Sequence, residues 1–205
     1  MVYWSAMKRV VGHVADTARF VRHFITDPQK TGAVVPSSRA LARLMADDLN
    51  LEKADLVVDV GAGTGAFTAE ALRRVRPEAK VMAVEINRHF ARVLKRRYPR
   101  AHVITDSVER LPRDIRKAGH RHADAVMCSL PWSHFPVALQ RRLLGAMVDS
   151  LRPGGRFSSF AYIHSAWWPS ARRFRRLLES RFRKVTRTRV AWLNVPPAYV
   201  YRCVK

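Results

Sequence analysis

The sequence predicts an α/β fold, in which helices cover a mostly parallel sheet and a helical arm precedes the sheet. From residue 56 onward, short apolar runs alternate with helix-length amphipathic segments, a pattern typical of βαβ units. The first run, Leu56–Val60, is almost continuously apolar, as in a strand that is buried on both faces. The last two runs are separated only by the short link Asn194-Val195-Pro196-Pro197, which predicts an antiparallel hairpin.

The elements of the body are expected in the following order. Strands are predicted at 56–60, 80–85, 102–105, 123–128 and 156–162, and a final pair at about 184–192 and 199–204. Helices are predicted at about 65–75, 88–97, near 113, 137–151 and 170–182, and a turn at Pro153-Gly154-Gly155 precedes the fifth strand. At 205 residues the chain has the length of one sizeable domain.

The N-terminal segment has a different pattern. Apolar residues recur at three- and four-residue steps from Tyr3 to Ile25, which predicts an amphipathic helix that ends before Pro28. A second helix is expected to begin after Ser37 or Ser38 as N-cap and to end near Leu49. We therefore divide the chain into an arm and cap, residues 1–50, and a body, residues 51–205.

Positive charge is concentrated near the C-terminus. The formal net charge is +22, and residues 151–205 carry 13 Lys or Arg against one acid. An Arg-rich composition, 30 Arg against 8 Lys, explains the ratio of the two bases but not the scarcity of acids. This field predicts a polyanionic partner, either a nucleic acid or an anionic membrane.

A glycine-rich turn, Asp59-Val60-Gly61-Ala62-Gly63-Thr64-Gly65, follows the first strand and opens a helix. Glycines permit unusual backbone torsions and let a ligand approach the chain closely. An acid at the strand end suits a cationic ligand and repels a phosphate, and a dinucleotide motif would carry glycine where Ala66 stands. The segment resembles the motif of class I S-adenosylmethionine (SAM)-dependent methyltransferases, whose product from SAM is S-adenosylhomocysteine. The resemblance implies the Rossmann-like sheet of that class, with seven strands in the order 3-2-1-4-5-7-6 and strand seven antiparallel.

Acids also end the second and third predicted strands. Glu85, about twenty residues after the glycine turn, is placed to accept hydrogen bonds from both ribose hydroxyls, and Ile86 would cover the adenine. Resemblance assigns Asp106 to the adenine amino group. Each acid taken singly is also compatible with a helix N-cap, but acids at successive strand ends favour a ligand site.

The fourth strand ends in Ser129-Leu130-Pro131-Trp132. Amino-group methyltransferases resemble it here, with Asn or Asp in place of Ser129 and an aromatic that packs on the acceptor. A serine hydroxyl is a poor partner for a conjugated adenine amine, so an aliphatic amine is favoured. Such an amine must lose a proton, for which His134 and Tyr162 are candidate acceptors. The other reading of His134 is a loop histidine that faces solvent.

Across its length the chain resembles the short, soluble bacterial phospholipid N-methyltransferases, above all in Thr26–Ser38, Ser129–Pro131 and Asn194–Tyr201. The resemblance implies stepwise methylation of phosphatidylethanolamine towards phosphatidylcholine. It also implies that the arm binds the membrane and covers the site, although a helix that caps the core is an alternative for the same residues. We expect a cytoplasmic monomer, peripherally associated with the inner face of the membrane through its anionic surface, with nucleic acid a less favoured partner.

The predicted site residues fall into three groups. The cofactor positions are Gly32, Ala33, Asp59, Gly61, Gly63, Thr64, Gly65, Glu85, Ile86, Asp106, Ser107, Ser129 and Leu130. The catalytic positions are Ser129, Pro131, His134 and Tyr162, and the substrate positions are Lys30, Ser38, Arg39 and Trp132; no metal is expected.

Two alternative functions stay open. The first is an rRNA adenine N6-dimethyltransferase, which the absence of an amide at Ser129 disfavours. The second is a catalytically inactive SAM-fold module that tethers by charge, which the intact glycines, Glu85 and Asp106 disfavour. The strand order also separates Cys128 and Cys203 by two inter-strand steps, roughly 9.5 Å, so we expect two free core thiols.

Overall fold

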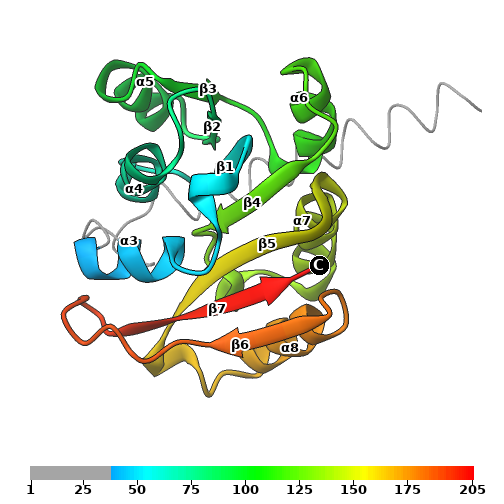
Figure 1. The fold of residues 1–205 in the computed structure, drawn as a ribbon. Helices are drawn as coiled ribbons and strands as arrows, with labels where there is room; N and C mark the ends of the chain where they lie inside the picture. Colours follow the sequence, from blue (N-terminus) through cyan, green and yellow to red (C-terminus); the bar gives the residue numbers. More distant parts are fainter. Residues whose placement is uncertain (1–37) are drawn as a thin grey trace, which may run out of the picture.

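A computed structural model describes residues 38–205 of the chain. In this part a single sheet has the order β3-β2-β1-β4-β5-β7-β6 (Figure 1), as predicted. The strands are β1 (Leu56–Val60), β2 (Lys80–Val84), β3 (Ala101–Ile104), β4 (Ala123–Cys128), β5 (Leu151–Tyr162), β6 (Lys184–Arg187) and β7 (Ala198–Val204). Strands β1 to β5 run parallel to one another, and β7 is antiparallel to both β5 and β6.

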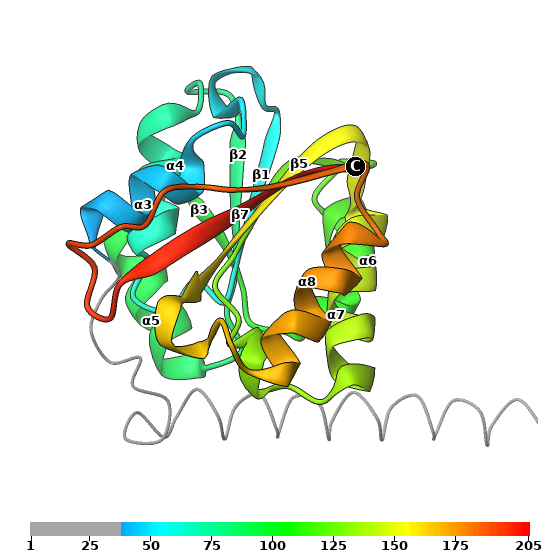
Figure 2. The ribbon, with the colours of Figure 1, turned by 90° about the horizontal axis from the view of Figure 1, so that it is seen from below.

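Helices cover both faces of the sheet (Figures 1 and 2). One layer holds α3 (Arg39–Ala46), α4 (Ala66–Arg74) and α5 (Arg88–Arg97), and the other holds α6 (Leu111–Lys117), α7 (Val137–Ser150) and α8 (Pro169–Glu179). Short 3-10 helices are η1 (Leu51–Lys53), η2 (Val108–Arg110), η3 (Trp132–His134) and η4 (Ile163–Ser165). None of these helices combines the length and the apolar composition that a bilayer crossing requires.

The apolar run of β1 is buried on both faces, because successive side chains enter different cores. Val58 and Val60 pack in the core beneath α6, α7 and α8, whereas Val57 packs in the core beneath α3 and α4. By the same alternation Asp59 points to the α4 side, so the one polar side chain of the strand meets the helix that follows the glycine turn.

Several element bounds differ from the prediction. Strand β5 begins at Leu151, before the predicted turn, because Leu151 pairs with Ala123 and the register shifts before the pairing resumes at Arg156. Strand β6 ends at Arg187, and only a single bridge, Ala191 to Ala198, continues the pairing. Helix α8 ends three residues earlier than predicted, at Glu179.

Helix α3 belongs to the same core as the body, although the sequence division places it in the arm. Leu41 and Met45 of α3 are fully buried in the cluster that contains Val57 of β1 and Val200 of β7. The remainder of the predicted arm, including Lys30, Gly32 and Ala33, lies outside the described residues. Cys128 and Cys203 are buried and free, as predicted.

Candidate functional site

The parallel strands bring the predicted cofactor residues from Asp59 onward to one edge of the sheet, the edge at which α/β folds bind ligands. The glycine turn leaves β1 there, with Gly61, Gly63 and Gly65 at positive φ of 74°, 54° and 90°. The amide of Gly61 donates to the Val84 carbonyl oxygen at 2.9 Å, which fixes the turn against the end of β2. Glycine adopts these positive φ angles without strain because it has no Cβ atom.

Asp59 is fully buried at the end of β1 and has one unused oxygen. The Thr68 hydroxyl of α4 donates to Asp59 Oδ2 at 2.6 Å, whereas Asp59 Oδ1 is buried and has no hydrogen-bond partner among residues 38–205. Burial raises the pKa of Asp59 to about 7, opposed by the Thr68 bond and reinforced by the charge of Glu85. A buried acceptor of this kind lacks a donor, and a cationic ammonium group is a suitable one.

Glu85 connects the end of β2 with the glycine turn. Its Oε2 accepts from the Gly63 amide at 2.8 Å and its Oε1 accepts from the Asn87 amide at 2.7 Å. The side chain is almost fully buried. Burial raises the pKa of Glu85, and the amide bonds from Asn87 and Gly63 oppose that rise. The carboxylate lines the cleft, as the ribose prediction requires, but it also holds the turn in place.

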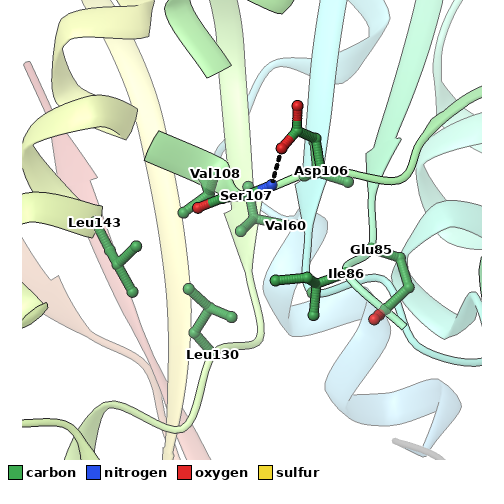
Figure 3. Close-up of a pocket in the computed structure, with 10 residues that line it drawn as sticks. Val60, Glu85, Ile86, Asp106, Ser107, Val108, Leu130 and Leu143 are labelled. Carbon is green, nitrogen blue, oxygen red and sulfur yellow. Dashed lines mark hydrogen bonds between the residues drawn. The ribbon is translucent and has the colours of Figure 1, made fainter. Parts of the chain in front are cut away.

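Asp106 lies at the end of β3 and is already engaged by two arginines. Arg110 and Arg113 approach Asp106 Oδ2 at 3.1 and 2.9 Å, and the Ser107 amide donates to Oδ1 at 2.7 Å. Burial favours a higher pKa for Asp106, but these donors outweigh it and hold the pKa below its usual value. Figure 3 shows the carboxylate turned away from Glu85 and Ile86. The Ser107 hydroxyl caps η2 by accepting from the Glu109 amide.

A cleft of about 350 Å³, its open mouth included, lies between these strand ends (Figure 3). Its walls are mostly apolar, with Glu85, Asp106 and Ser107 as the polar exceptions. The lining residues are Val60, Gly61, Val84, Glu85, Ile86, Asp106, Ser107, Val108, Leu130 and Leu143. Ile86 points across the cleft toward Leu130. A flat apolar slot beside a buried carboxylate and a glycine turn fits a nucleoside with a cationic tail.

Ser129, which the sequence places at the acceptor, bonds to the glycine turn. Its hydroxyl donates to the Gly61 carbonyl oxygen at 2.6 Å, and its amide donates to the Val60 carbonyl oxygen at 3.0 Å. A Cβ atom at Gly61 would lie 3.2 Å from the Ser129 Oγ. Ser129 therefore stands between the cofactor cleft and the acceptor side, with its proton directed to the turn.

A second pocket, about 610 Å³ with its open mouth, begins at Ser129 and continues beneath α8. Aromatic, apolar and neutral polar side chains line it. They are Ser129, Leu130, Pro131, Trp132, Ser133, His134, Phe160, Ala161, Tyr162, Ser165, Ala171, Phe174 and Tyr201. Among these residues there is no Lys, Arg, Asp or Glu. The structure thus brings together the four predicted catalytic residues, Ser129, Pro131, His134 and Tyr162.

Trp132, a predicted substrate position, is more deeply buried than a residue needs to be in order to contact a substrate. It is buried, its Nε1 donates to the Ser159 hydroxyl at 3.0 Å, and its ring stacks on Phe174 with centroids 4.3 Å apart. The indole therefore forms the floor of the pocket.

His134 and Tyr162, which line this pocket, both lie against aromatic rings from η4 and the residues after it. The Trp168 ring lies edge-on to His134 at 5.4 Å, and His164 stacks on Tyr162 at 5.5 Å. Burial and then the charge of His164 lower the pKa of His134, so the imidazole is neutral near pH 7 and can accept a proton. Burial raises the pKa of Tyr162.

Sequence reasoning did not identify Phe174 or Tyr201 as part of this pocket. Phe174 and Tyr201 come from α8 and β7, far along the chain from Ser129. A usable signal existed in the inward positions of the predicted helix and strand, where Phe174 and Tyr201 fall on apolar faces.

Ser38 and Arg39 line neither the cleft nor the acceptor pocket. The Ser38 hydroxyl is the N-cap of α3 and accepts from the Leu41 amide at 3.1 Å. Their role as phosphate ligands stays a prediction.

Comparisons with known proteins identify the chemistry. Residues 57–155 match a family described as a methyltransferase domain. An ornithine lipid N-methyltransferase from Singulisphaera acidiphila is 33% identical over 187 residues, which cover 90% of this chain and 93% of that protein.

Solved structures show the same fold at lower identity. An O-methyltransferase from Bacillus cereus in complex with S-adenosylhomocysteine superposes with a TM-score of 0.63 at 15% identity, over 98% of this chain and 97% of that one. Magnesium protoporphyrin IX methyltransferase from Synechocystis, with bound SAM, gives 0.62 at 15% identity, over 91% and 84% of the two chains. The glycine turn, the strand order and the relative that matches along nearly its whole length all lead to one conclusion. The chain belongs to the class I SAM-dependent methyltransferases.

Proposed function

We propose that this methyltransferase transfers methyl groups to the primary amine of a membrane lipid headgroup. The observation that carries the proposal is the acceptor pocket, whose lining within residues 38–205 is aromatic, apolar and neutral polar and includes no Lys, Arg, Asp or Glu. The named lipid N-methyltransferase that is 33% identical supports the same class of acceptor.

The pocket suits an amine because it disfavours the ammonium form. An ammonium group that leaves water for an apolar site has a lowered pKa, so the lone pair needed for attack becomes available. His134 has a lowered pKa and lines the pocket, where it can take the proton that the amine releases. The aromatic rings of Trp132 and Tyr162 stabilise the remaining positive charge of a methylated amine.

Bound SAM would supply the methyl group as an electrophilic sulfonium. The chain contributes mainly orientation and exclusion of water. Ser129 links the two halves of the site, since its hydroxyl holds the glycine turn while its backbone and Leu130 separate the cleft from the pocket. Ser129 has no side-chain carbonyl that could hold a conjugated amine, which agrees with an aliphatic amine as the acceptor.

Two headgroups fit this chemistry. Phosphatidylethanolamine, the acceptor that the resemblance implies, carries a primary amine and a phosphate, and an ornithine headgroup carries a primary amine and a carboxylate. Among the described residues that line the pocket neither anion has a cationic partner, so either group would lie outside this part of the lining. We propose phosphatidylethanolamine as the acceptor, ornithine lipid as the second candidate, and peripheral attachment to the cytoplasmic face of the membrane as the location.

The test is methyl transfer from labelled SAM to vesicles of phosphatidylethanolamine with phosphatidylglycerol, to matched vesicles containing ornithine lipid, and to ribosomal RNA. Label in either lipid supports the proposal, and the ratio of the two rates identifies the headgroup. Label in RNA alone, or in none of the three, overturns it. Glu85→Ala, which removes the predicted ribose ligand, is the negative control, and its SAM binding is measured separately by calorimetry.

A further inference from the structure

We propose that Trp167, Trp168, Trp192, Leu193 and Val195 form a docking rim that inserts into the interface of an anionic phospholipid bilayer. The proposal rests on the proposed lipid substrate. It adds to the predicted arm a membrane contact that belongs to the body of the enzyme itself.

The rim consists of apolar side chains that the fold leaves in water. Trp192 is 72% exposed, Leu193 85% and Val195 68%, on the loop between β6 and β7. Trp167 is 76% exposed and Trp168 41%, at the connection from η4 to α8. These are the large apolar side chains exposed within residues 38–205. A cluster of this kind on a soluble surface indicates an interaction site.

The two connections lie side by side. Tyr162, the last residue of β5, pairs with Ala198, the first residue of β7, and the Ile163 amide donates to the Pro197 carbonyl oxygen at 3.1 Å. Figures 1 and 2 show both connections leaving the sheet at the same edge. The exposed side chains of both connections therefore lie at the same end of the sheet, and we call them together the rim.

The polarity of the β6–β7 loop is the reverse of an ordinary surface loop. Asn194 is only 3% exposed, between neighbours that are mostly in solvent. Its Oδ1 accepts from the Ser38 amide at 3.0 Å, and its Nδ2 donates to the Pro196 carbonyl oxygen at 2.8 Å. The polar side chain anchors the loop inside, and the apolar side chains are held outward.

The rim borders the acceptor pocket. Tyr162 and Ser165, on one side of the Trp167–Trp168 pair, and Ala171, on the other, line that pocket. Trp168 itself lies against His134, which lines the pocket. A bilayer on the rim would thus place lipid headgroups next to residues that line the pocket.

The charge around the rim and the types of its side chains favour a membrane over other possible partners. Arg172, Arg173, Arg187 and Arg189 are exposed around the rim, and Glu179, the sole acid among residues 151–205, is paired with Arg175 at 2.8 Å. Tryptophans favour the headgroup level and arginines favour anionic lipid. Leu193 and Val195 have no base-stacking surface for RNA, and two copies at +22 each would repel one another.

Insertion is tested at a single position. Leu193→Cys in the full chain is labelled with an environment-sensitive fluorophore, since both native cysteines are buried. Glu52→Cys, an exposed position of η1 just before the amino end of β1, is the matched control. With vesicles of phosphatidylethanolamine and phosphatidylglycerol, the probe at 193 is expected to shift to shorter wavelength and the probe at 52 is not.

A second variant measures the contribution to binding. Trp192→Ser with Leu193→Ser is expected to lower vesicle partitioning by about tenfold or more, while its thermal unfolding and its activity on the same lipid in detergent micelles are unchanged. No shift at 193, a shift that rises with protein concentration alone, or a shift with RNA instead of vesicles overturns the rim. Failure of the proposed function is separate, because it would appear as absent lipid methylation in micelles as well.

Discussion

At Gly65, the last residue of the glycine turn, both the backbone torsion and the packing exclude a side chain. Its φ is +90°, and an added Cβ would overlap the Tyr98 ring and lie 2.8 Å from the Leu94 side chain of α5. We expect Gly65→Ala to cost about 2–5 kcal/mol of unfolding free energy, from left-handed strain and overpacking together. Chemical denaturation measures the loss.

Gly119 supplies the matched control for that substitution. It has a similar φ of +86°, but nothing lies within 4 Å of an added Cβ. Gly119→Ala should therefore show the strain alone, roughly 1–2 kcal/mol. Equal losses at the two positions would contradict a packing role for Gly65.

Asp59 makes stability depend on pH. Its pKa is raised from 3.8 to about 7 in the fold, so the folded chain holds the proton more tightly than the unfolded chain. The resulting stabilisation is complete below pH 4 and is lost as the pH rises towards 7. Between pH 5 and pH 8 the chain should lose roughly 2–3 kcal/mol through this group. Asp59→Asn should lose correspondingly less in denaturant titrations at the two pH values.

Saturating SAM should abolish the pH dependence of stability that Asp59 causes. A cationic ammonium that donates to the unpartnered Oδ1 favours the ionised carboxylate, so the loss between pH 5 and pH 8 should disappear in the complex. A loss that persists with SAM bound would place the ammonium elsewhere.

At the scale of helices and strands, one aromatic side chain of α8 packs against the acceptor pocket. Phe174 stacks on Trp132 at 4.3 Å and meets Tyr201 edge-on at 6.3 Å. Phe174→Ala should cost about 3–5 kcal/mol and raise the KM for the lipid. SAM affinity should be unchanged, because α8 contributes no residue to the cofactor cleft.

Phe67 of α4 is the comparison for Phe174. It is equally buried, in the core beside the glycine turn, and Phe67→Ala should cost a similar amount but weaken SAM binding. Calorimetry with SAM and lipid kinetics separate the two effects. A weakened SAM affinity in Phe174→Ala would contradict the division of the site into two compartments.

At this scale the sequence predicted the element order well and the ends less well. Strands β1 and β4 and helix α5 have the predicted bounds, since each is a clear apolar run or amphipathic stretch. Strand β5 starts early because the Gly154 amide and the Gly155 carbonyl oxygen both bond to Lys205, the last residue of the chain. A pairing between residues so far apart has no local signature.

The same limit applies to the site. The glycine turn and its acids could be predicted because local spacing encodes them. The bond from the Ser129 hydroxyl to the Gly61 carbonyl oxygen depends on the β1–β4 register, and the burial of Trp132 depends on α8. Neither the bond nor the burial could be predicted from the sequence, because each depends on how residues that are distant in the sequence come together in the fold.

For the whole molecule, the net charge of +22 should make catalysis on vesicles depend on ionic strength while cofactor binding does not. Charges that attract an anionic surface act through solvent and are screened within about 8–10 Å near physiological salt. The cofactor contacts are buried, so salt affects them little. Raising the salt from about 50 to 500 mM should therefore lower the methylation rate on anionic vesicles severalfold.

Rates on the same lipid in uncharged detergent micelles should change much less over that range, and the Kd for SAM should stay constant. Vesicles that lack phosphatidylglycerol are the second control, and they should show slow methylation at every salt concentration. A rate on anionic vesicles that is independent of salt would mean that the arginines near the rim are merely solvated. Attachment would then rest on apolar insertion alone, and the double substitution at Trp192 and Leu193 should abolish it.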